Sequence, residues 1–367
     1  MAGSTYNIDG NAAFEATAGA GTIVISGANP TFTLHDDTID FLNGGVSLGN
    51  GTFTVNSQGG AITIAGAVTG TSAENITLNS GSTGGATVAV GVIGGSNQIH
   101  AINITGTDGV TLNGNITTDD TSGASVSITG PVTLGGSITI DTQGANNDGT
   151  ITFASSASIN GNETLTLDSG TGAIALQGVI GDGTALAGLV INTTDGTQNT
   201  GTIEIFDIGD DDPATGVDGT VYGTDSQAEN LTITTGTGTA TIGGTIGGTT
   251  PLTTISINAT GSGAIDLAGI GDSNTVGTTG SGTATVGHTS TTTLTLSGSH
   301  YRTDGSQTYT AVTGGGNIDI TGTSASFTTT NDAIAFNTSG VDLANNGTTT
   351  INTCLLYTSD AADEERG

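Results

Sequence analysis

Residues 163–192 read ETLTLDSGTGAIALQGVIGDGTALAGLVIN, and residues 229–258 read ENLTITTGTGTATIGGTIGGTTPLTTISIN. The two segments align without a gap at an offset of 66 residues and share the frame E-x-L-T-[LI], G-T-G, G-x-I-G, L and I-N. A third copy begins at Glu74 and has two extra residues in its first turn. Serial copies of this kind indicate a repeat protein in which each unit packs on its neighbours.

Apolar residues recur at every second position throughout the chain, as in Ile62-Thr-Ile, Ile138-Thr-Ile and Leu294-Thr-Leu. This period is typical of a strand that buries one of its two faces. Val, Ile and Thr suit strands, and the 64 glycines, together with Asn, Asp and Ser, suit turns. The low complexity and the net charge of -31 are features of disordered chains. The sustained alternation nevertheless indicates an ordered, all-β chain.

The short strands follow one another every 10 to 15 residues or so, which fits a sandwich, a barrel or a solenoid. Serial repeats, the lack of a closing element and glycines at the corners favour a β-solenoid, that is a parallel β-helix, over residues 1–353. With rungs of roughly 20–25 residues, the rod would have about 15 rungs and a length of about 70 Å. We expect a thin core of Ile, Val, Leu and Ala, with the eight Phe dispersed along it. An array of immunoglobulin-like β-sandwich domains is the alternative, but the chain has no Trp and lacks a period of about 90–100 residues.

The segment 354–367, CLLYTSDAADEERG, breaks the pattern of the preceding chain. It resembles a translated sequencing adaptor, so we expect a non-native tail that begins after residue 353. Cys354, the only cysteine, and Arg366, one of two basic residues, belong to this tail. We therefore expect no disulfide or thiolate chemistry in residues 1–353.

The N-terminus has neither the basic region nor the apolar region of a signal peptide. No stretch approaches the roughly 20 apolar residues of a membrane helix, so no direct membrane insertion of this segment is expected. For this composition, we interpret the chain as a fragment of a longer exported protein.

The segments GTIGGTTPLTTI (residues 244–255) and TDGSQTY (residues 303–309) resemble the β-strand repeats of filamentous-haemagglutinin-type and autotransporter-like bacterial adhesins. The resemblance implies a protein that is secreted or held on the bacterial outer surface, with a rod that projects a binding region. It also implies a carbohydrate or protein of a host or matrix as partner. The secretion domain and membrane barrel of that family are not visible in the sequence.

The charge of the chain excludes several partners. Outside the tail the single base is Arg302, whereas nucleic acids and anionic membranes are bound by basic surfaces. The glycine-rich run at residues 243–248 is not a phosphate loop, because no G-K-[ST] follows it. We therefore expect no nucleic acid partner.

We expect a structural or adhesive stalk rather than an enzyme. A polysaccharide-active β-helix enzyme is the second hypothesis, and it needs basic residues or paired carboxylates such as Asp210 and Asp211. An ice-binding or surface-binding solenoid is the third hypothesis. It needs Thr-x-Thr motifs, which begin here at Thr164, Thr232 and Thr293, to stack in register on one flat face.

The four histidines show no metal-ligand spacing, and we expect isolated surface side chains. They are His35, His100, His288 and His300. The run His300-Tyr301-Arg302 brings an imidazole, a phenol and a guanidinium together, either as a site for a carbohydrate or anion or as an ordinary loop.

An acidic segment interrupts the repeats between Ile205 and Leu231. Carboxylates and turn carbonyls are the donors that Ca²⁺ prefers, although the spacing fits neither an EF-hand loop nor a calcium β-roll. The segment is therefore either a calcium site or a solvated acidic insertion. The candidate ligands are Asp207, Asp210, Asp211, Asp212 and Asp218, and Asp225 lies in the same segment.

Overall fold

The computed structural model describes most of the chain. The described residues are 1–16, 21–42, 44–71, 74–82, 84–95, 97–145, 147–181, 184–194, 202–205, 230–248, 251–272, 276–279, 282–288, 293–311, 316–338, 340–344 and 347–353.

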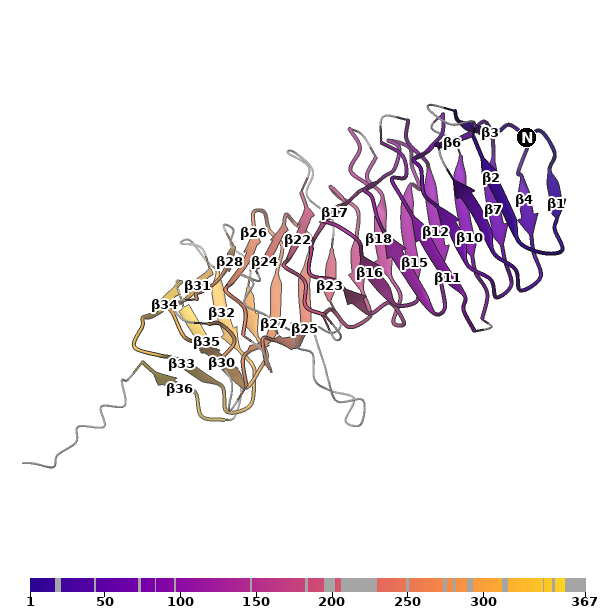
Figure 1. Ribbon diagram of the computed structural model, residues 1–367. Helices are drawn as coiled ribbons and strands as arrows, with labels where there is room; N and C mark the ends of the chain where they lie inside the picture. The colour runs from indigo at the N-terminus through magenta and orange to yellow at the C-terminus, as the bar shows by residue number, and fades with distance from the viewer. Residues whose placement is uncertain are drawn as a thin grey trace, which may run out of the picture.

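Throughout the described residues the chain forms 36 strands and no helix. The strands wind into a parallel β-helix of about 12 turns, which forms a rod from the indigo N-terminal turn to the yellow C-terminal turn (Figure 1). The predicted all-β solenoid is confirmed. The sandwich alternative is wrong, because the strands pair in parallel with those one turn away.

Each turn has three sides, which we call faces A, B and C in chain order. Face A consists of β1 (Thr5–Asn7), β4 (Thr31–Thr33), β7 (Thr52–Asn56), β10 (Asn75–Asn79), β12 (Ala101–Thr105), β15 (Ser125–Thr129), β18 (Thr150–Phe153), β21 (Ile174–Leu176), β23 (Ile203–Ile205), β25 (Ala240–Ile246), β27 (Ile265–Ile270), β29 (Leu294–Leu296), β32 (Asn317–Ile320) and β35 (Gly340–Leu343).

Face B follows face A in each turn. It begins with β2 (Ala12–Glu15), β5 (Ile39–Leu42), β8 (Ile62–Ile64), β11 (Thr87–Val90), β13 (Gly109–Leu112), β16 (Val132–Leu134) and β19 (Ile159–Asn160). Near the C-terminal end, the later residues of β25 and β27 occupy this side of the turn, and the sheet of face A continues around the corner. The strands that complete face B there are β30 (His300–Thr303), β33 (Ser326–Thr329) and β36 (Thr350–Asn352).

Face C closes each turn. Its first three strands are linked to the rest by single bridges at Ile93. The strands are β3 (Ile23–Ile25), β6 (Val46–Leu48), β9 (Val68–Thr69), β14 (Ile116–Thr117), β17 (Ile138–Asp141), β20 (Thr164–Asp168), β22 (Gly188–Thr193), β24 (Asn230–Thr235), β26 (Thr254–Ala259), β28 (Ala284–His288), β31 (Gln307–Ala311) and β34 (Ile334–Asn337).

The core consists of columns of inward side chains, in which each residue stacks on its counterpart one turn away. On face A one such column runs the length of the rod, and its members from Phe32 to Ile320 are at most 1% exposed. Each aliphatic side chain buried in this way contributes roughly 1.5–3 kcal/mol. The column is Tyr6, Phe32, Val55, Leu78, Ile104, Ile128, Phe153, Leu176, Ile205, Ile242, Leu267, Leu296, Ile320 and Leu343.

The 66-residue repeat of the sequence corresponds to two turns. Leu165 pairs with Leu189, and Leu189 pairs with Leu231, all on face C. The copy that begins at Glu74 leads instead into β10 on face A. Sequence similarity therefore identifies a strand and its turn, but it does not identify the face on which they lie.

The rod has about 12 turns rather than the expected 15 or so. The turns vary in length: Thr31 pairs with Thr54, 23 residues on, whereas Ile205 pairs with Ile242, 37 residues on. At about 4.8 Å per turn, 12 turns give a rod of about 58 Å.

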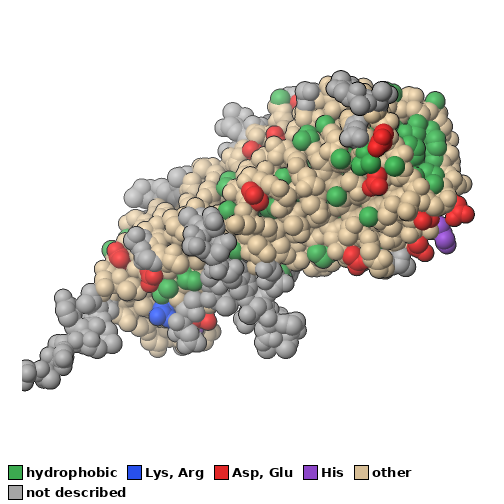
Figure 2. Space-filling model, in the orientation of Figure 1, with side chains coloured by type: hydrophobic (Ala, Val, Ile, Leu, Met, Phe, Trp, Pro, Cys, Tyr) green, Lys and Arg blue, Asp and Glu red, His purple; other side chains and the backbone are tan. Residues whose placement is uncertain are grey.

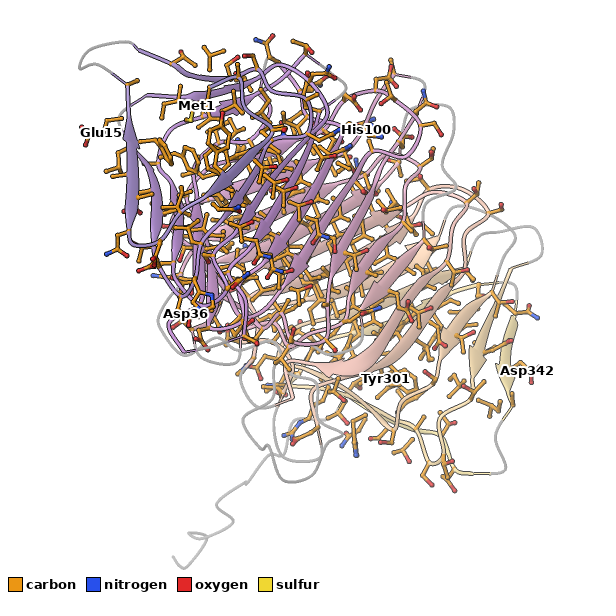
Figure 3. All side chains as sticks on the ribbon, turned by 90° about the vertical axis from the view of Figure 1, so that its right-hand side faces the viewer. Met1, Glu15, Asp36, His100, Tyr301 and Asp342 are labelled. Carbon is orange, nitrogen blue, oxygen red and sulfur yellow. The ribbon has the colours of Figure 1, made fainter. Side chains whose placement is uncertain are left out.

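Most of the aromatic rings that the structure describes gather near the two ends of the rod, while Phe153 lies between them, so the phenylalanines are less evenly dispersed than expected. Phe32 contacts Tyr6, Phe14, Phe41 and Phe53, with ring centroids 4.4–5.8 Å apart. In the last turns a second group forms from Tyr301, Tyr309, Phe327 and Phe336. Figure 3 shows how side chains fill the space that the three faces enclose. The rings pack in these end turns through stacked and edge-to-face contacts.

Buried hydroxyls close many corners of the turns. Ser or Thr directly after a strand turns inward and donates to a carbonyl a few residues ahead. Ser80 Oγ donates to Ala86 O at 2.8 Å, Thr142 Oγ1 to Gly149 O at 2.8 Å and Ser169 Oγ to Gly172 O at 2.7 Å. These bonds satisfy carbonyls at the corners, where the chain leaves the sheet.

Two glycines of one turn test the corner geometry. Gly130 has φ +103°, and a Cβ placed there would lie 1.9 Å from Gly106 O, whereas a Cβ on Gly136 would meet nothing within 4 Å. We expect Gly130→Ala to lower the free energy of unfolding by about 1–3 kcal/mol or more, because the backbone must move. Gly136→Ala should leave it unchanged or raise it by up to about 1 kcal/mol. Urea unfolding followed by circular dichroism measures both, and equal effects would contradict this account of the corners.

Candidate functional site

The outer surface of face A carries two adjacent columns of uncharged polar side chains, which we call the polar face. Their residues alternate with those of the buried columns, so they point outward. The first column is Thr5, Thr31, Thr54, Thr77, Asn103, Ser127 and Thr152, and the second is Asn7, Thr33, Asn56, Asn79, Thr105 and Thr129. These residues of the first seven turns include no carboxylate. In the later turns the first column continues with Ala175, Glu204, Thr241, Asp266, Thr295, Asp319 and Asp342, so the polar face is uncharged only in the N-terminal half of the rod.

The polar face offers a regular grid of hydrogen-bond donors and acceptors. Neighbours within a column lie about 4.8 Å apart, and the two columns are separated by about 6.6 Å, twice the strand rise. Figure 2 shows an extended surface in tan with scattered acidic side chains. Hydroxyl and amide groups both donate and accept, so such a grid can bind a hydroxyl-rich or amide-rich surface without a charge.

The Thr-x-Thr motifs singled out for ice binding do not share one pair of columns. Thr166 and Thr232 lie in one column of face C, two turns apart with Val190 between them. Thr164, however, shares its column with Gly188 and Asn230. Thr295 lies on face A. These motifs are therefore shifted by one column or placed on another face. The ice-binding hypothesis stays a prediction.

The histidines lie far apart along the chain's described part. His35 is exposed, and its Nδ1 is 3.1 Å from Gln58 Oε1. His288 ends β28, and His300 begins β30.

Across the described residues, no group of three or more His, Cys, Asp or Glu side chains has a geometry that could hold a metal ion. The predicted calcium ligands Asp207, Asp210, Asp211, Asp212 and Asp218, the pair Asp210 and Asp211 proposed for hydrolysis, and the tail with Cys354 lie outside the described residues.

His100 is not an isolated surface side chain, and no spacing in the sequence points to its partner, Asp119. Its Nδ1 lies 2.9 Å from Asp119 Oδ1, and Thr121 Oγ1 lies 2.7 Å from both atoms. The stacking of adjacent turns positions the group, because Asp119 N donates to Ile99 O. The Asp119 side chain is 1% exposed and that of His100 is 24% exposed. Figure 3 labels His100.

This group does not have the geometry of a nucleophile–histidine–carboxylate triad. A hydroxyl nucleophile activated by histidine faces one ring nitrogen while the carboxylate holds the other. Here Thr121 and Asp119 both meet Nδ1. The imidazole therefore serves as the partner of a buried carboxylate, whose Oδ2 has no hydrogen-bond partner in the structure.

We expect His100→Ala to destabilise the rod by about 1–3 kcal/mol, because Asp119 would stay buried with one partner fewer. His35→Ala, which alters an exposed side chain, should change the free energy of unfolding by less than about 0.5 kcal/mol. Urea unfolding of the two variants at pH 7 compares them. A loss of the same size in both would contradict a supporting role for His100.

Acidic side chains gather where face C meets the following corner. Asp141 pairs in register with Asp168, and Asp148 lies nearby, its Oδ2 accepting from Thr171 N at 2.6 Å. Burial raises the pKa of Asp141 above its ordinary value of 3.8, and the charges of Asp168 and Asp148 raise it further, against the hydrogen bond from Gln143 N. Carboxylates are therefore crowded here, yet no described group of them has metal-binding geometry.

The raised pKa of Asp141 makes stability depend on pH. The folded state binds the proton more tightly than the unfolded state, so this group lowers stability as the pH rises from about 3.8 through the folded pKa. Asp141→Asn keeps an oxygen for Gln143 N and removes the charge. We expect it to raise the melting temperature at pH 7 and to have a smaller effect at pH 3, where Asp141 is protonated. Thermal unfolding at both values measures the difference, and an equal gain at both would contradict it.

The run His300-Tyr301-Arg302 does not bring its three groups together. His300 and Arg302 lie on the outside of β30, whereas Tyr301 is fully buried. Tyr301 Oη donates to Leu267 O at 2.9 Å, and burial raises the pKa of its phenol far above the ordinary value of 10. The alternative of an ordinary loop is wrong, because these residues form β30, and the alternative of a shared site is wrong for the phenol, because alternation along the strand places it in the core.

No known protein family, curated protein or solved structure matches the chain. No helix long and apolar enough to span a membrane occurs among the residues that the structure describes. The fold therefore defines the class on its own: the chain is a parallel β-helix repeat protein.

Proposed function

We propose that this chain is a non-catalytic structural rod, the stalk of an adhesive protein that is secreted or displayed on the bacterial outer surface. The observation that carries the proposal is the unbroken stack of inward side chains along about 12 turns, beneath a polar face that is uncharged in its first seven turns. Each turn is joined to the next by main-chain hydrogen bonds along the axis, which suits a spacer that must resist extension.

The partner that fits the polar face is a hydroxyl-rich or amide-rich surface, such as a carbohydrate or protein of a host or matrix. Hydroxyl and amide side chains repeat along the axis, so many weak contacts add up over a long partner. The acidic remainder of the surface repels nucleic acids and anionic membranes. The resemblance to adhesin repeats agrees with this assignment.

A polysaccharide-active enzyme is the less favoured candidate. Cleavage of acidic polysaccharides needs a base and cations near the substrate, and Arg302 is the only basic residue in residues 1–353. A pair of carboxylates at the separation found in glycosidases is not evidence for such an enzyme in so acidic a chain, unless the pair lines a groove.

Adhesion of protein-coated beads tests the proposal. Beads carrying the full chain should bind at least one of a panel of cellulose, chitin, mucin and collagen. Ser127→Asp with Thr152→Asp places two charges in the polar face and should reduce bound beads severalfold. Ser256→Asp with Thr285→Asp is the matched control, since these residues are also neighbours in an outer column but on face C. The control should bind as the unchanged chain does.

Three outcomes would overturn the proposal: binding to none of the four surfaces, equal loss in both double variants, or release of reducing ends or unsaturated uronates from a polysaccharide. Melting temperatures of the two variants show whether the charges disturb the fold to the same extent.

A further inference from the structure

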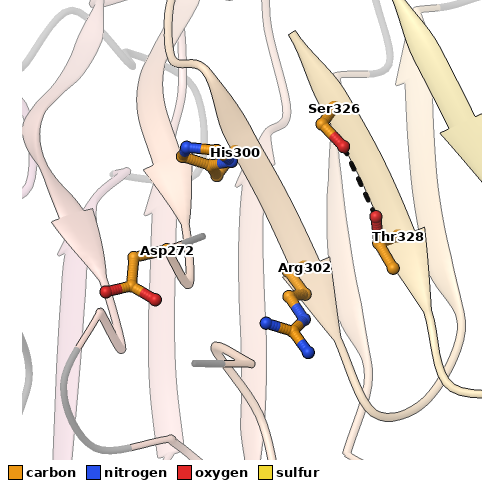
Figure 4. Close-up of a pocket in the computed structure, with 5 residues that line it drawn as sticks. All are labelled: Asp272, His300, Arg302, Ser326 and Thr328. Atoms are coloured by element: carbon orange, nitrogen blue, oxygen red, sulfur yellow. Dashed lines mark hydrogen bonds between the residues drawn. The ribbon is translucent and has the colours of Figure 1, made fainter. Parts of the chain in front are cut away.

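A hollow of about 250 Å³ lies on the outside of face B near the C-terminal end of the rod. Its lining residues are Asp272, His300, Arg302, Ser326 and Thr328. His300 and Arg302 come from β30, and the register places Ser326 directly beside His300 and Thr328 beside Arg302. Figure 4 shows these side chains around the hollow, with Asp272 contributed from the segment after β27.

The two strands that carry the hollow are fixed from beneath. Between the four outward side chains, Tyr301 and Phe327 point inward and stack with their ring centroids 4.7 Å apart and an interplanar angle of 9°. Tyr301 Oη accepts from Gly298 N at 2.8 Å and donates to Leu267 O. The positions of His300 and Arg302 are thus set by a packed, hydrogen-bonded layer directly below them.

A buried polar side chain adds to this support. Gln307 is fully buried, and its Nε2 donates at 2.8 Å both to Tyr301 O on β30 and to Thr328 O on β33. Its Oε1 accepts from Tyr309 Oη at 3.0 Å. One amide therefore holds the backbones of both strands of the hollow at the level of Arg302 and Thr328.

Gln307 is a polar residue in an inward column whose neighbouring members are apolar. The preceding members of that inward column on face C are apolar, namely Leu189, Leu231, Ile255 and Ala284, and the next member is Ile334. A polar group in a core column disfavours folding unless every bond is made, so it marks a place where geometry matters more than stability. The place that it fixes is the floor of the hollow.

We propose that this hollow binds a sugar unit that carries one carboxylate, such as a uronic acid. The Arg302 guanidinium can hold a carboxylate in a bidentate manner. The hydroxyls of Ser326 and Thr328 and the imidazole of His300 can bond to ring hydroxyls, and Asp272 can accept from two vicinal hydroxyls. A neutral sugar offers no carboxylate to the guanidinium, whereas a simple anion offers no hydroxyl groups to Asp272 and is repelled by its charge.

Size and charge agree with this ligand. Drug-sized molecules occupy pockets of roughly 300–1,000 Å³, so a hollow of about 250 Å³ fits a single sugar ring. Arg302 is the only basic residue in residues 1–353, so a monoanionic ligand meets a cationic side chain here and a net negative surface elsewhere. The hollow is separate from the polar face of face A, so this inference and the proposed adhesion can fail independently.

Isothermal titration calorimetry of the full chain tests the site, with sodium galacturonate, galactose, sodium acetate and inorganic phosphate as probes. We expect galacturonate to bind at least about tenfold more tightly than the other three. Arg302→Gln should weaken galacturonate binding by about tenfold or more, and Thr328→Val, which removes one hydroxyl at constant shape, by about threefold.

Asn317→Asp is the matched control, because it changes the net charge as Arg302→Gln does but lies exposed on face A. It should leave the affinity within about twofold of the unchanged chain. Acetate or phosphate binding as tightly as galacturonate would overturn the sugar site in favour of a small-anion site. Unchanged affinity in both Arg302→Gln and Thr328→Val would overturn it altogether. If Arg302→Gln lowers the melting temperature, Thr328→Val and Arg302→Lys decide the outcome.

Discussion

The main-chain hydrogen bonds between successive turns are the interaction on which the rest of the structure depends. They run along the axis and hold each strand in parallel register with its counterpart one turn away, as in the five-residue pairing of β10 with β12. Because side chains alternate along a strand, this register assigns every residue to an inner or an outer column. A slip of one residue would turn Ile102 and Ile104 outward and Asn103 inward. The buried column and the polar face of face A are therefore two consequences of one constraint.

The register constrains strands but leaves the corners free to differ in length. Turns of 23 and of 37 residues occur in the same rod without loss of the inner column, because Ile205 and Ile242 still pair. Corners need two local devices: glycine where a Cβ would strike the backbone of the neighbouring turn, and inward Ser or Thr hydroxyls that bond to corner carbonyls. The abundance of Gly, Ser and Thr in the sequence thus follows from the geometry of a three-sided coil.

Features that depend on the local sequence pattern, such as strands with one buried side, could be predicted from the sequence. Features that depend on how the turns stack on one another could not. The alternation around Leu165 and Leu231 predicted strands with one buried side, and the 66-residue offset placed them in equivalent positions. The same similarity did not show that two turns separate them, or that the copy at Glu74 begins on another face. The repeat length in the sequence does not determine on which face a copy lies, because the strands of all three faces have similar residues.

The sites show the same limit. In a strand, alternation directs Tyr301 away from His300 and Arg302, so the phenol could have been separated from the other two groups on the sequence alone. The partners of those two side chains were not accessible from the sequence, because Ser326 and Thr328 lie one turn further on. The contact of His100 with Asp119 likewise joins residues 19 apart, at a corner where no spacing rule applies.

Some of the acidic side chains have a structural role as well as an effect on the charge of the surface. At several corners a carboxylate accepts main-chain N–H groups that belong to the neighbouring turn, at a separation of 22–27 residues. Asp108 accepts from Gly85 N at 2.6 Å and from Ala86 N at 3.0 Å, and Asp120 accepts from Asn147 N at 2.7 Å. Lysine and arginine have only donors, so they cannot replace an aspartate in this position. Side chains with an acceptor oxygen, Asp at these corners and Asn at others, therefore suit these positions, whereas basic side chains do not. The cationic side chain of Arg302 stands out against that background, above strands that a buried amide holds in place.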